Sequence, residues 1–206
     1  MFFAQYSRRC VGLLAVAMVL SACASTPELT PSAAPAGNYT LDPTHTSVTW
    51  SLSHAGLSNY TARFDKTSGT LDFDPDNPEN SAVFITIDPA SVSTGLPDFD
   101  QTLATDSRYF DVNSYPEITF VSTQIIKTGD STADITGDLT FRGVTKPVTL
   151  KTKFYGAGKS FGNPGKTLGF SAETTLLRSN FNMTHLISFG IGDEVEIRIE
   201  TEFNEG

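Results

Sequence analysis

Ser160 stands in the stretch GKSFG, which fits the G-x-S-x-G pattern of serine hydrolases. In that pattern a tight turn presents a nucleophilic serine between a strand and a helix. Here glycine, lysine, asparagine and proline surround the serine, so no helix is expected to follow it. We therefore interpret the match as coincidental and expect no nucleophilic chemistry at Ser160.

A run of carboxylates, DFDPDN at residues 72–77, resembles the start of a calcium-binding loop because its acidic residues alternate. Such a loop needs glycine at its sixth position and glutamate at its twelfth. Those positions hold Asn77 and Val83. The run is therefore predicted to be a solvated strand end and turn, with weak surface binding of calcium left open. No metal or other cofactor is expected.

Three histidines, His45, His54 and His185, lie too far apart in the sequence for the close pairing of many metal motifs. Each is expected in a turn or at the rim of a barrel. His54 follows an apolar strand directly, so its imidazole is expected at a pocket mouth, where it would hydrogen-bond a ligand headgroup. As an alternative, His54 or His185 would be the general base of an enzyme acting on a lipid-like substrate. The sequence offers no nucleophile to accompany them. This lack of recognisable catalytic motifs favours a binding protein over an enzyme.

Residues 1–22 are typical of an export signal, because Arg8 and Arg9 precede a short apolar run that ends in small residues. The run is too short to span a bilayer. It closes on LSAC, which resembles the lipobox of bacterial lipoproteins, so Cys23 is predicted to be acylated and to anchor the chain to a membrane. Residues 23–37 are rich in proline, alanine, serine and threonine and are predicted to form a flexible tether. The alternative is an ordinary signal peptide that leaves Cys23 unmodified.

The lipobox also predicts a location. The chain is expected in the cell envelope, facing the periplasm, and Ala24 in place of an aspartate favours the outer membrane. Cys10 would be removed with the signal, so no disulfide is expected. The oligomeric state is left open, with a homodimer as one option.

The charge balance excludes one class of partner. The 206 residues carry a formal charge of −9, and removal of Arg8 and Arg9 with the signal leaves 12 basic and 23 acidic residues, a charge of −11. Such a surface repels nucleic acid. The remaining residues, 38–206, suit one domain with a substantial core.

Alternation of apolar and polar residues dominates the chain from Tyr39 onward and predicts half-buried antiparallel strands. The alternating stretches are SVTWSL, SAVFITID, EITFVSTQII, ADITGDLTF, VTLKTKF, LGFSAETTL and EVEIRIETEF. About eight strands with short turns predict an all-β fold, a closed antiparallel barrel, because closure removes exposed edges. A sandwich is the competing architecture. The interior of such a barrel is either filled by its own side chains or hollow.

Two stretches depart from this alternation. LPDFDQTLATDSRYF, at residues 96–110, spaces its apolar residues near the helical period, and Pro97 suits a first helical turn, so a short helix capping the sheet is expected. RSNFNMTHLISFG, at residues 178–190, is predicted to be a loop or bent strand near the barrel mouth.

Several of these stretches together resemble the YceI-like family of secreted bacterial proteins. They are YTLDPTHTSVTWSLSHAGLSNYTARF, SGTLDFDPDNPENSAVFITIDPASVSTG, YFDVNSYPEITFVST, ITGDLTFRGVTKPVTL and GDEVEIRIE. The resemblance covers residues 38–203 and implies an eight-stranded lipocalin-like barrel with a helical insertion, whose apolar interior holds a polyisoprenoid or similar long-chain lipid. Where the family has Arg-His and His-Leu pairs, this chain has Ser53-His54 and Thr102-Leu103. These departures put the headgroup preference in doubt rather than the binding of a tail.

The leading hypothesis is therefore a non-enzymatic protein that binds, transports or stores a polyisoprenoid or quinone-like lipid. The expected pocket wall is apolar and aromatic, with one imidazole. It comprises Trp50, Leu52, His54, Ile85, Phe120, Leu139, Phe141, Phe154, Phe170, Phe181 and Met183. The alternative is that these residues only fill the core of a ligand-free structural or interaction lipoprotein.

Overall fold

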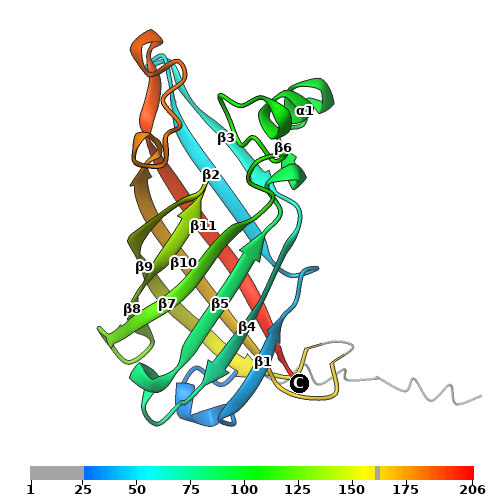
Figure 1. Cartoon of the computed structure of the whole chain (residues 1–206). Coiled ribbons are helices and arrows are strands. Elements are labelled where there is room, and N and C mark those ends of the chain that lie inside the picture. Colours follow the sequence, from blue (N-terminus) through cyan, green and yellow to red (C-terminus); the bar gives the residue numbers. More distant parts are fainter. Residues whose placement is uncertain (1–25, 161–162) are drawn as a thin grey trace, which may run out of the picture.

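The computed structural model describes residues 26–160 and 163–206, which form one antiparallel sheet that closes on itself (Figure 1). The signal peptide expected at residues 1–22 and the acylation expected at Cys23 lie outside the described residues. The strands are β1 (Gly37–Leu41), β2 (Ser47–His54), β3 (Ser58–Phe64), β4 (Thr67–Phe73), β5 (Ala82–Ile87), β6 (Val92–Ser93), β7 (Ile118–Lys127), β8 (Thr132–Phe141), β9 (Val144–Gly158), β10 (Thr167–Leu177) and β11 (Ile191–Glu205).

Six of the short strands combine into three long, bent barrel strands. β1 and β2 both pair with β11 and form the first long strand. β4 pairs with β1, and β3 pairs with β2, so β3 and β4 form the second. β5 pairs with β4, and β6 pairs with β3, so β5 and β6 form the third. Counted in this way, the barrel has eight strands in chain order, each beside its sequence neighbour, and the pairing of β11 with β1 closes it. The prediction of an all-β, eight-stranded antiparallel barrel is therefore confirmed, and a sandwich is excluded.

The sequence alternation sets which side chains face the interior. On β11, Val195, Ile197 and Ile199 alternate with exposed charged residues that face outward, as period two requires. At Gly137 on β8, the backbone lies so close to the Phe120 ring that a Cβ there would clash with Phe120 Cζ. Glycine at this position therefore lets the Phe120 side chain lie across the neighbouring strand.

The predicted helix is present as α1 (Pro97–Thr105), the α-helix of the described chain. Pro97 occupies its first turn, where no intrahelical donor is lost, and Asp98 and Asp100 suit the positive end of the helix dipole. Leu103 and Ala104 are buried against the barrel. The helix covers one end of the barrel beside β3 and β6 (Figure 1).

The described 3₁₀ turns lie in the connections: η1 (Pro31–Ala33), η2 (Pro78–Asn80), η3 (Pro89–Ser91), η4 (Arg178–Phe181) and η5 (Ile187–Phe189). The last two belong to the segment of residues 178–190, which was predicted to be a loop or bent strand. It lies at the same end of the barrel as α1 (Figure 1). No helix among the described residues combines the length and the apolar character needed to cross a membrane.

The chain just before β1 packs on the barrel. Glu28 forms a bridge with Ala157, Ala34 is buried in the core, and the Tyr39 hydroxyl donates to the Pro35 carbonyl at 2.8 Å. The prediction of a flexible tether over residues 23–37 therefore needs correction for residues 28–35. Composition alone missed this docking, because the contacts are made by a few small residues and by the backbone.

Two clusters of apolar side chains fill the barrel at different levels. The lower cluster, which we call the floor, lies at the end where β1 begins and includes Phe73, Phe154, Phe170 and Phe203. Ring centroids of Phe154 and Phe170 are 5.3 Å apart, and those of Phe170 and Phe203 are 6.0 Å apart. The upper cluster joins the strands to α1 and to the segment 178–190. The floor therefore closes the barrel below whatever space the upper half contains.

Candidate functional site

The upper half of the barrel contains a cavity of about 430 Å³. This volume lies within the range of about 300–1,000 Å³ that is typical of small-molecule sites. Its wall is overwhelmingly apolar and is contributed by inward-facing residues of most strands together with α1 and the segment 178–190. From Ile191 at the mouth to Thr201 near the floor, the wall follows β11 for roughly 33 Å at the usual strand rise. The cavity is thus elongated along the barrel strands.

The burial of inward-facing residues shows that this half of the barrel is hollow. Leu139, Val148, Leu176 and Ile197 pack against the upper cluster, yet each remains only half-buried because part of its side chain faces the cavity. By contrast, Leu168 in the floor is fully buried. The alternative of a completely filled interior therefore does not hold for the upper half.

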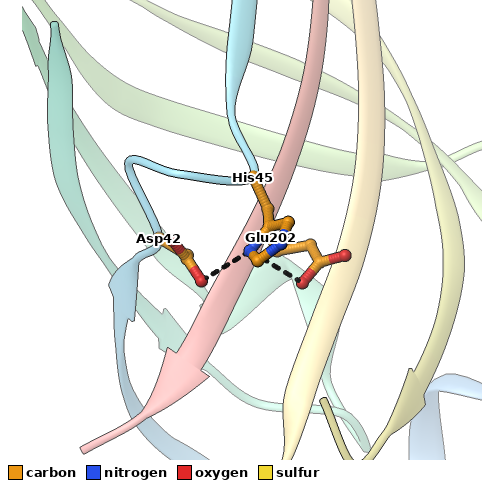
Figure 2. Close-up of side chains that lie close together, drawn as sticks. All are labelled: Asp42, His45 and Glu202. Carbon is orange, nitrogen blue, oxygen red and sulfur yellow. Dashed lines mark hydrogen bonds and ion pairs between the residues drawn. The ribbon is translucent and has the colours of Figure 1, made fainter. Parts of the chain in front are cut away.

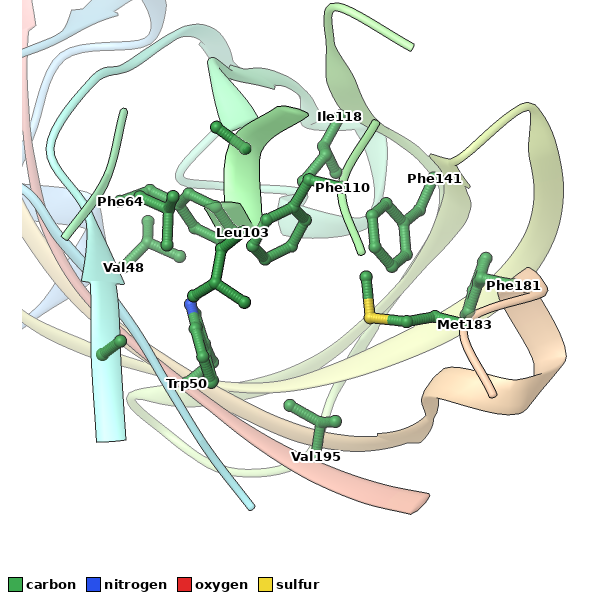
Figure 3. Packing of buried hydrophobic residues seen from close by; sticks show 13 residues of the cluster. Val48, Trp50, Phe64, Leu103, Phe110, Ile118, Phe141, Phe181, Met183 and Val195 are labelled. Carbon is green, nitrogen blue, oxygen red and sulfur yellow. The ribbon is translucent and has the colours of Figure 1, made fainter. Parts of the chain in front are cut away.

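Eight of the eleven residues expected to form a pocket wall line this cavity. They are Trp50, Leu52, His54, Ile85, Phe120, Leu139, Phe141 and Met183. Figure 3 shows Trp50, Phe141 and Met183 reaching toward the interior from different parts of the barrel.

The other three residues lie elsewhere. Phe154 and Phe170 belong to the floor and line a second cavity, of about 520 Å³, at the opposite end of the barrel. Phe181 is buried behind the wall, with its ring centroid 5.6 Å from that of Phe141. Strand alternation places the rings of Phe154 and Phe170 inside the fold but does not give their height along the barrel axis, and Phe181 lies in the 3₁₀ turn η4, outside any strand.

A set of aromatic rings surrounds the cavity mouth; we call it the collar. It comprises His54 and Tyr60 from the β2–β3 hairpin, Phe99 from α1, Tyr109, and His185 from the segment 178–190. Tyr60 packs edge-on against Phe99 at 6.0 Å, and Tyr109 against His185 at 5.3 Å between centroids. Edge-to-face packing of this kind links the three elements across the opening.

Four polar side chains of the collar have no hydrogen-bond partner in the described part of the chain. Within the described residues, the hydroxyls of Tyr60 and Tyr109 and the imidazoles of His54 and His185 make no side-chain hydrogen bond. Deeper in, Trp50 Nε1 is buried and has no hydrogen-bond partner in the described part of the chain. The cavity therefore offers a mainly apolar shaft with two tyrosine hydroxyls and two imidazoles at its mouth. The polar atoms along the shaft are fewer, namely Trp50 Nε1 and the hydroxyls of Thr46, Thr67, Thr174 and Thr201.

Arg178 holds the segment 178–190 in place. Its side chain is 4% exposed, and its guanidinium donates to the carbonyls of Gly192, Met183, His185 and Ile191 at 2.7–3.1 Å. Burial lowers the pKa of the guanidinium, while the charge of Asp193 opposes this shift. A planar group with five donors suits this task because it can satisfy several carbonyls at once. Arg178 thereby fixes the wall residues Met183, His185 and Ile191.

Several known proteins have a similar sequence and a similar fold. Residues 39–203 match the model of the YceI-like domain. The chain belongs to the YceI-like family. A UPF0312 protein of Pseudomonas putida is 40% identical over 139 residues, which cover 68% of this chain and 71% of the relative. The solved YceI protein of Campylobacter jejuni superimposes with a TM-score of 0.64 at 30% identity, covering 75% of this chain and 90% of its own.

A second solved structure shares the fold. A polyisoprenoid-binding domain from Saccharophagus degradans superimposes with a TM-score of 0.62, covering 82% of this chain and 98% of its own. At 16% identity, this similarity establishes the architecture alone. The match of residues 39–203 to the family model confirms the resemblance to the YceI-like family that the sequence indicated.

The two departures from the family's sequence pattern lie outside the cavity of this YceI-like chain. Ser53 is exposed on the outer face of β2, and Thr102 is exposed on α1, where its hydroxyl donates to the Asp98 carbonyl. Their neighbours His54 and Leu103 line the cavity instead. The departures therefore do not alter the wall directly.

Sequence reasoning missed several residues of this YceI-like cavity, above all Tyr60, Phe99 and Tyr109 in the collar. One signal was available for Tyr60, which stands opposite Leu52 across the β2–β3 hairpin. No comparable signal exists for Tyr109, because it follows α1 in an irregular stretch whose direction depends on tertiary packing.

Proposed function

We propose that this YceI-like protein binds a long-chain isoprenoid or quinone-like lipid in the upper cavity and carries or stores it in the cell envelope without chemical conversion. The observation that carries the proposal is the hollow apolar shaft closed by the floor and opened at the collar. The Saccharophagus degradans domain, which is described as polyisoprenoid-binding, supports the same class of ligand.

The energetics favour a hydrocarbon tail in the shaft. Burial of about twenty tail carbons at ~0.8 kcal/mol each gives roughly 16 kcal/mol before costs. Association and ordering of the chain consume much of this. The surplus still allows tight retention, and it requires no charged partner along the shaft.

The lipid is oriented by the distribution of polar groups. Carbonyl or hydroxyl oxygens of a headgroup find donors at the collar, where Tyr60, Tyr109, His54 and His185 have free hydrogen-bonding capacity within the described chain. The tail then points toward the floor. In this proposal Cys23 anchors the protein, and the mouth receives lipid from a membrane on the periplasmic side.

Native mass spectrometry of the full-length chain, produced in a bacterial host, tests the proposal. We expect a discrete added mass that yields a prenyl or quinone lipid on extraction. A protein that is isolated bare and also takes up no added prenyl lipid would contradict the proposal and favour an interaction lipoprotein.

Catalysis inside the barrel is the second candidate function, with His54 or His185 as general base. Within the described residues, neither imidazole hydrogen-bonds a carboxylate that would orient it. A general base normally needs such positioning. The geometry therefore favours binding over turnover.

The floor is expected to set the length of tail that the cavity accepts. Leu41 and Ile85 face the upper cavity, while Phe73, Phe154 and Phe170 face the lower one. Phe170→Ala should open a passage between the two cavities and shift the bound lipids toward longer tails, as measured by mass spectrometry of extracts.

The control for this length effect is Phe181→Ala, which also removes a ring from the fold but leaves the floor intact. Both variants should lose free energy of unfolding, by about 3–5 kcal/mol for a fully buried ring such as Phe181 and by less for the half-buried Phe170. An unchanged distribution of tail lengths in folded Phe170→Ala would show that the floor does not limit the ligand.

A further inference from the structure

Asp42, His45 and Glu202 come together on the outside of the barrel, where the chain bends between β1 and β2 and passes β11 (Figure 2). Asp42 Oδ2 is 2.9 Å from His45 Nδ1, and Glu202 Oε2 is 4.0 Å from the same nitrogen. One ligand atom from each residue lies within 4.8 Å of the other two. Figure 2 shows the imidazole between the two carboxylates.

The bend that carries two of these residues is fastened to β11. The Asp42 amide donates to the Glu202 carbonyl at 2.8 Å. The Thr46 hydroxyl donates to the Asp42 carbonyl at 2.7 Å and lies 2.9 Å from the Thr201 hydroxyl. The relative position of the three side chains is therefore set by backbone pairing and not by the exposed imidazole alone.

Asp42 is also oriented by its own hydrogen bonds. Its Oδ1 accepts from the amide and hydroxyl of Thr44 at 2.8 and 2.6 Å, and its Oδ2 accepts from Asn204 Nδ2 at 3.2 Å. Partners of this kind hold the carboxylate ligands of metal sites in position.

Glu202 is the residue of the three that has a carboxylate oxygen without a hydrogen-bond partner in the described chain. Its side chain is 37% exposed, but this oxygen, Oε2, which faces the imidazole, is itself buried. Within that same part of the chain, neither Asp42 nor Glu202 forms an ion pair with lysine or arginine. A buried carboxylate oxygen without a partner is costly, so this atom is suited to a cation.

The separations fit a divalent transition metal. Ligand bonds of 2.0–2.2 Å in a tetrahedral zinc site place neighbouring ligand atoms about 3.4 Å apart. The two separations from His45, 2.9 and 4.0 Å, lie on either side of this value, and the Asp42 and Glu202 ligand atoms lie within 4.8 Å of each other, so side-chain shifts of about 1 Å would bring all three around one ion. One imidazole and two carboxylates are ligands that zinc accepts, and the solvent-exposed side leaves room for water as a fourth.

We propose that Asp42, His45 and Glu202 form a binding site for a divalent cation of the zinc class, which clamps the β1–β2 bend to β11. The site lies outside the lipid cavity and is independent of the proposed function. It joins residues that are about 160 positions apart in the sequence, which is why the spacing of the histidines gave no sign of it.

Isothermal titration of the full-length protein with Zn²⁺, in a preparation without a histidine tag, tests this site. We expect one equivalent to bind the wild type. Glu202→Gln should weaken binding by about tenfold or more, because it removes a ligand but leaves the Asp42 turn intact. The matched control is Glu200→Gln, which makes the same charge change at an exposed, outward-facing position of β11 and should bind as the wild type does.

Absence of a stoichiometric binding event in the wild type would overturn the proposal. Equal weakening in Glu202→Gln and Glu200→Gln would also overturn it, because it would indicate general attraction of the cation to an acidic surface. Circular dichroism confirms that each variant is folded, and His45→Gln gives a second loss of one ligand should Glu202→Gln fail to fold.

Discussion

Replacement of Ile197 by glutamate is expected to abolish lipid retention while the barrel still folds. Ile197 lies on β11 opposite Trp50 and lines the shaft. A carboxylate there can be hydrated while the cavity is empty, since the residue is only half-buried, but a hydrocarbon tail would strip that water away. The penalty for an unpaired polar group is about 3 kcal/mol or more, which corresponds to a loss of affinity of about a hundredfold.

The matched control for Ile197→Glu is Arg198→Glu. Arg198 is the next residue on the same strand and is exposed on the outer face. Native mass spectrometry should show lipid on Arg198→Glu and none on Ile197→Glu, with both variants giving the same circular dichroism spectrum. Retention of lipid by folded Ile197→Glu would place the ligand elsewhere, with the lower cavity as the next place to test.

Replacement of Arg178 by lysine is expected to destabilise the protein strongly although the charge is kept. The guanidinium serves four carbonyls, whereas an ammonium group donates from a single point and cannot reach them all. If two buried carbonyls lose their partner at about 1–3 kcal/mol each, the free energy of unfolding falls by about 2–6 kcal/mol. Urea denaturation measures this loss.

The effect of Arg178→Lys should be concentrated at the cavity mouth. Amide hydrogen exchange is expected to accelerate in residues 183–192, because their carbonyls are those that Arg178 holds. Arg108→Lys is the control, since Arg108 forms an exposed ion pair with Asp106 and such pairs contribute about 0–1 kcal/mol. A stability of Arg178→Lys equal to that of Arg108→Lys would show that the carbonyls find other partners.

The strand pattern was readable in the sequence because one face of each strand meets the interior and the other meets water. Stretches such as EVEIRIETEF therefore predicted both the strand and the inward direction of Ile197 and Ile199. Short turns between the strands predicted neighbouring antiparallel pairs, and closure followed from the need to satisfy two edges. The helix at Pro97 was also readable, because its apolar spacing differs from period two.

The height of each side chain along the barrel was not readable. Phe141 and Phe170 occupy equivalent inward positions on alternating strands, yet Phe141 lines the upper cavity and Phe170 belongs to the floor. Their level depends on strand tilt and on the register between β8, β9 and β10, which arise from pairings along the whole sheet. The packed chain before β1 escaped prediction for a similar reason, since Ala34 is buried only because the barrel end offers it a place.

The sequence by itself determined the class of fold, the inward and outward faces of its strands and the family, since local alternation and turn residues encode them directly. Only the tertiary structure decided that the upper half is hollow, because a void is the difference between the barrel's volume and the summed volumes of all the side chains that enter it. The tertiary structure alone also brought His45 beside Glu202, because that contact exists only after the last strand has closed the barrel.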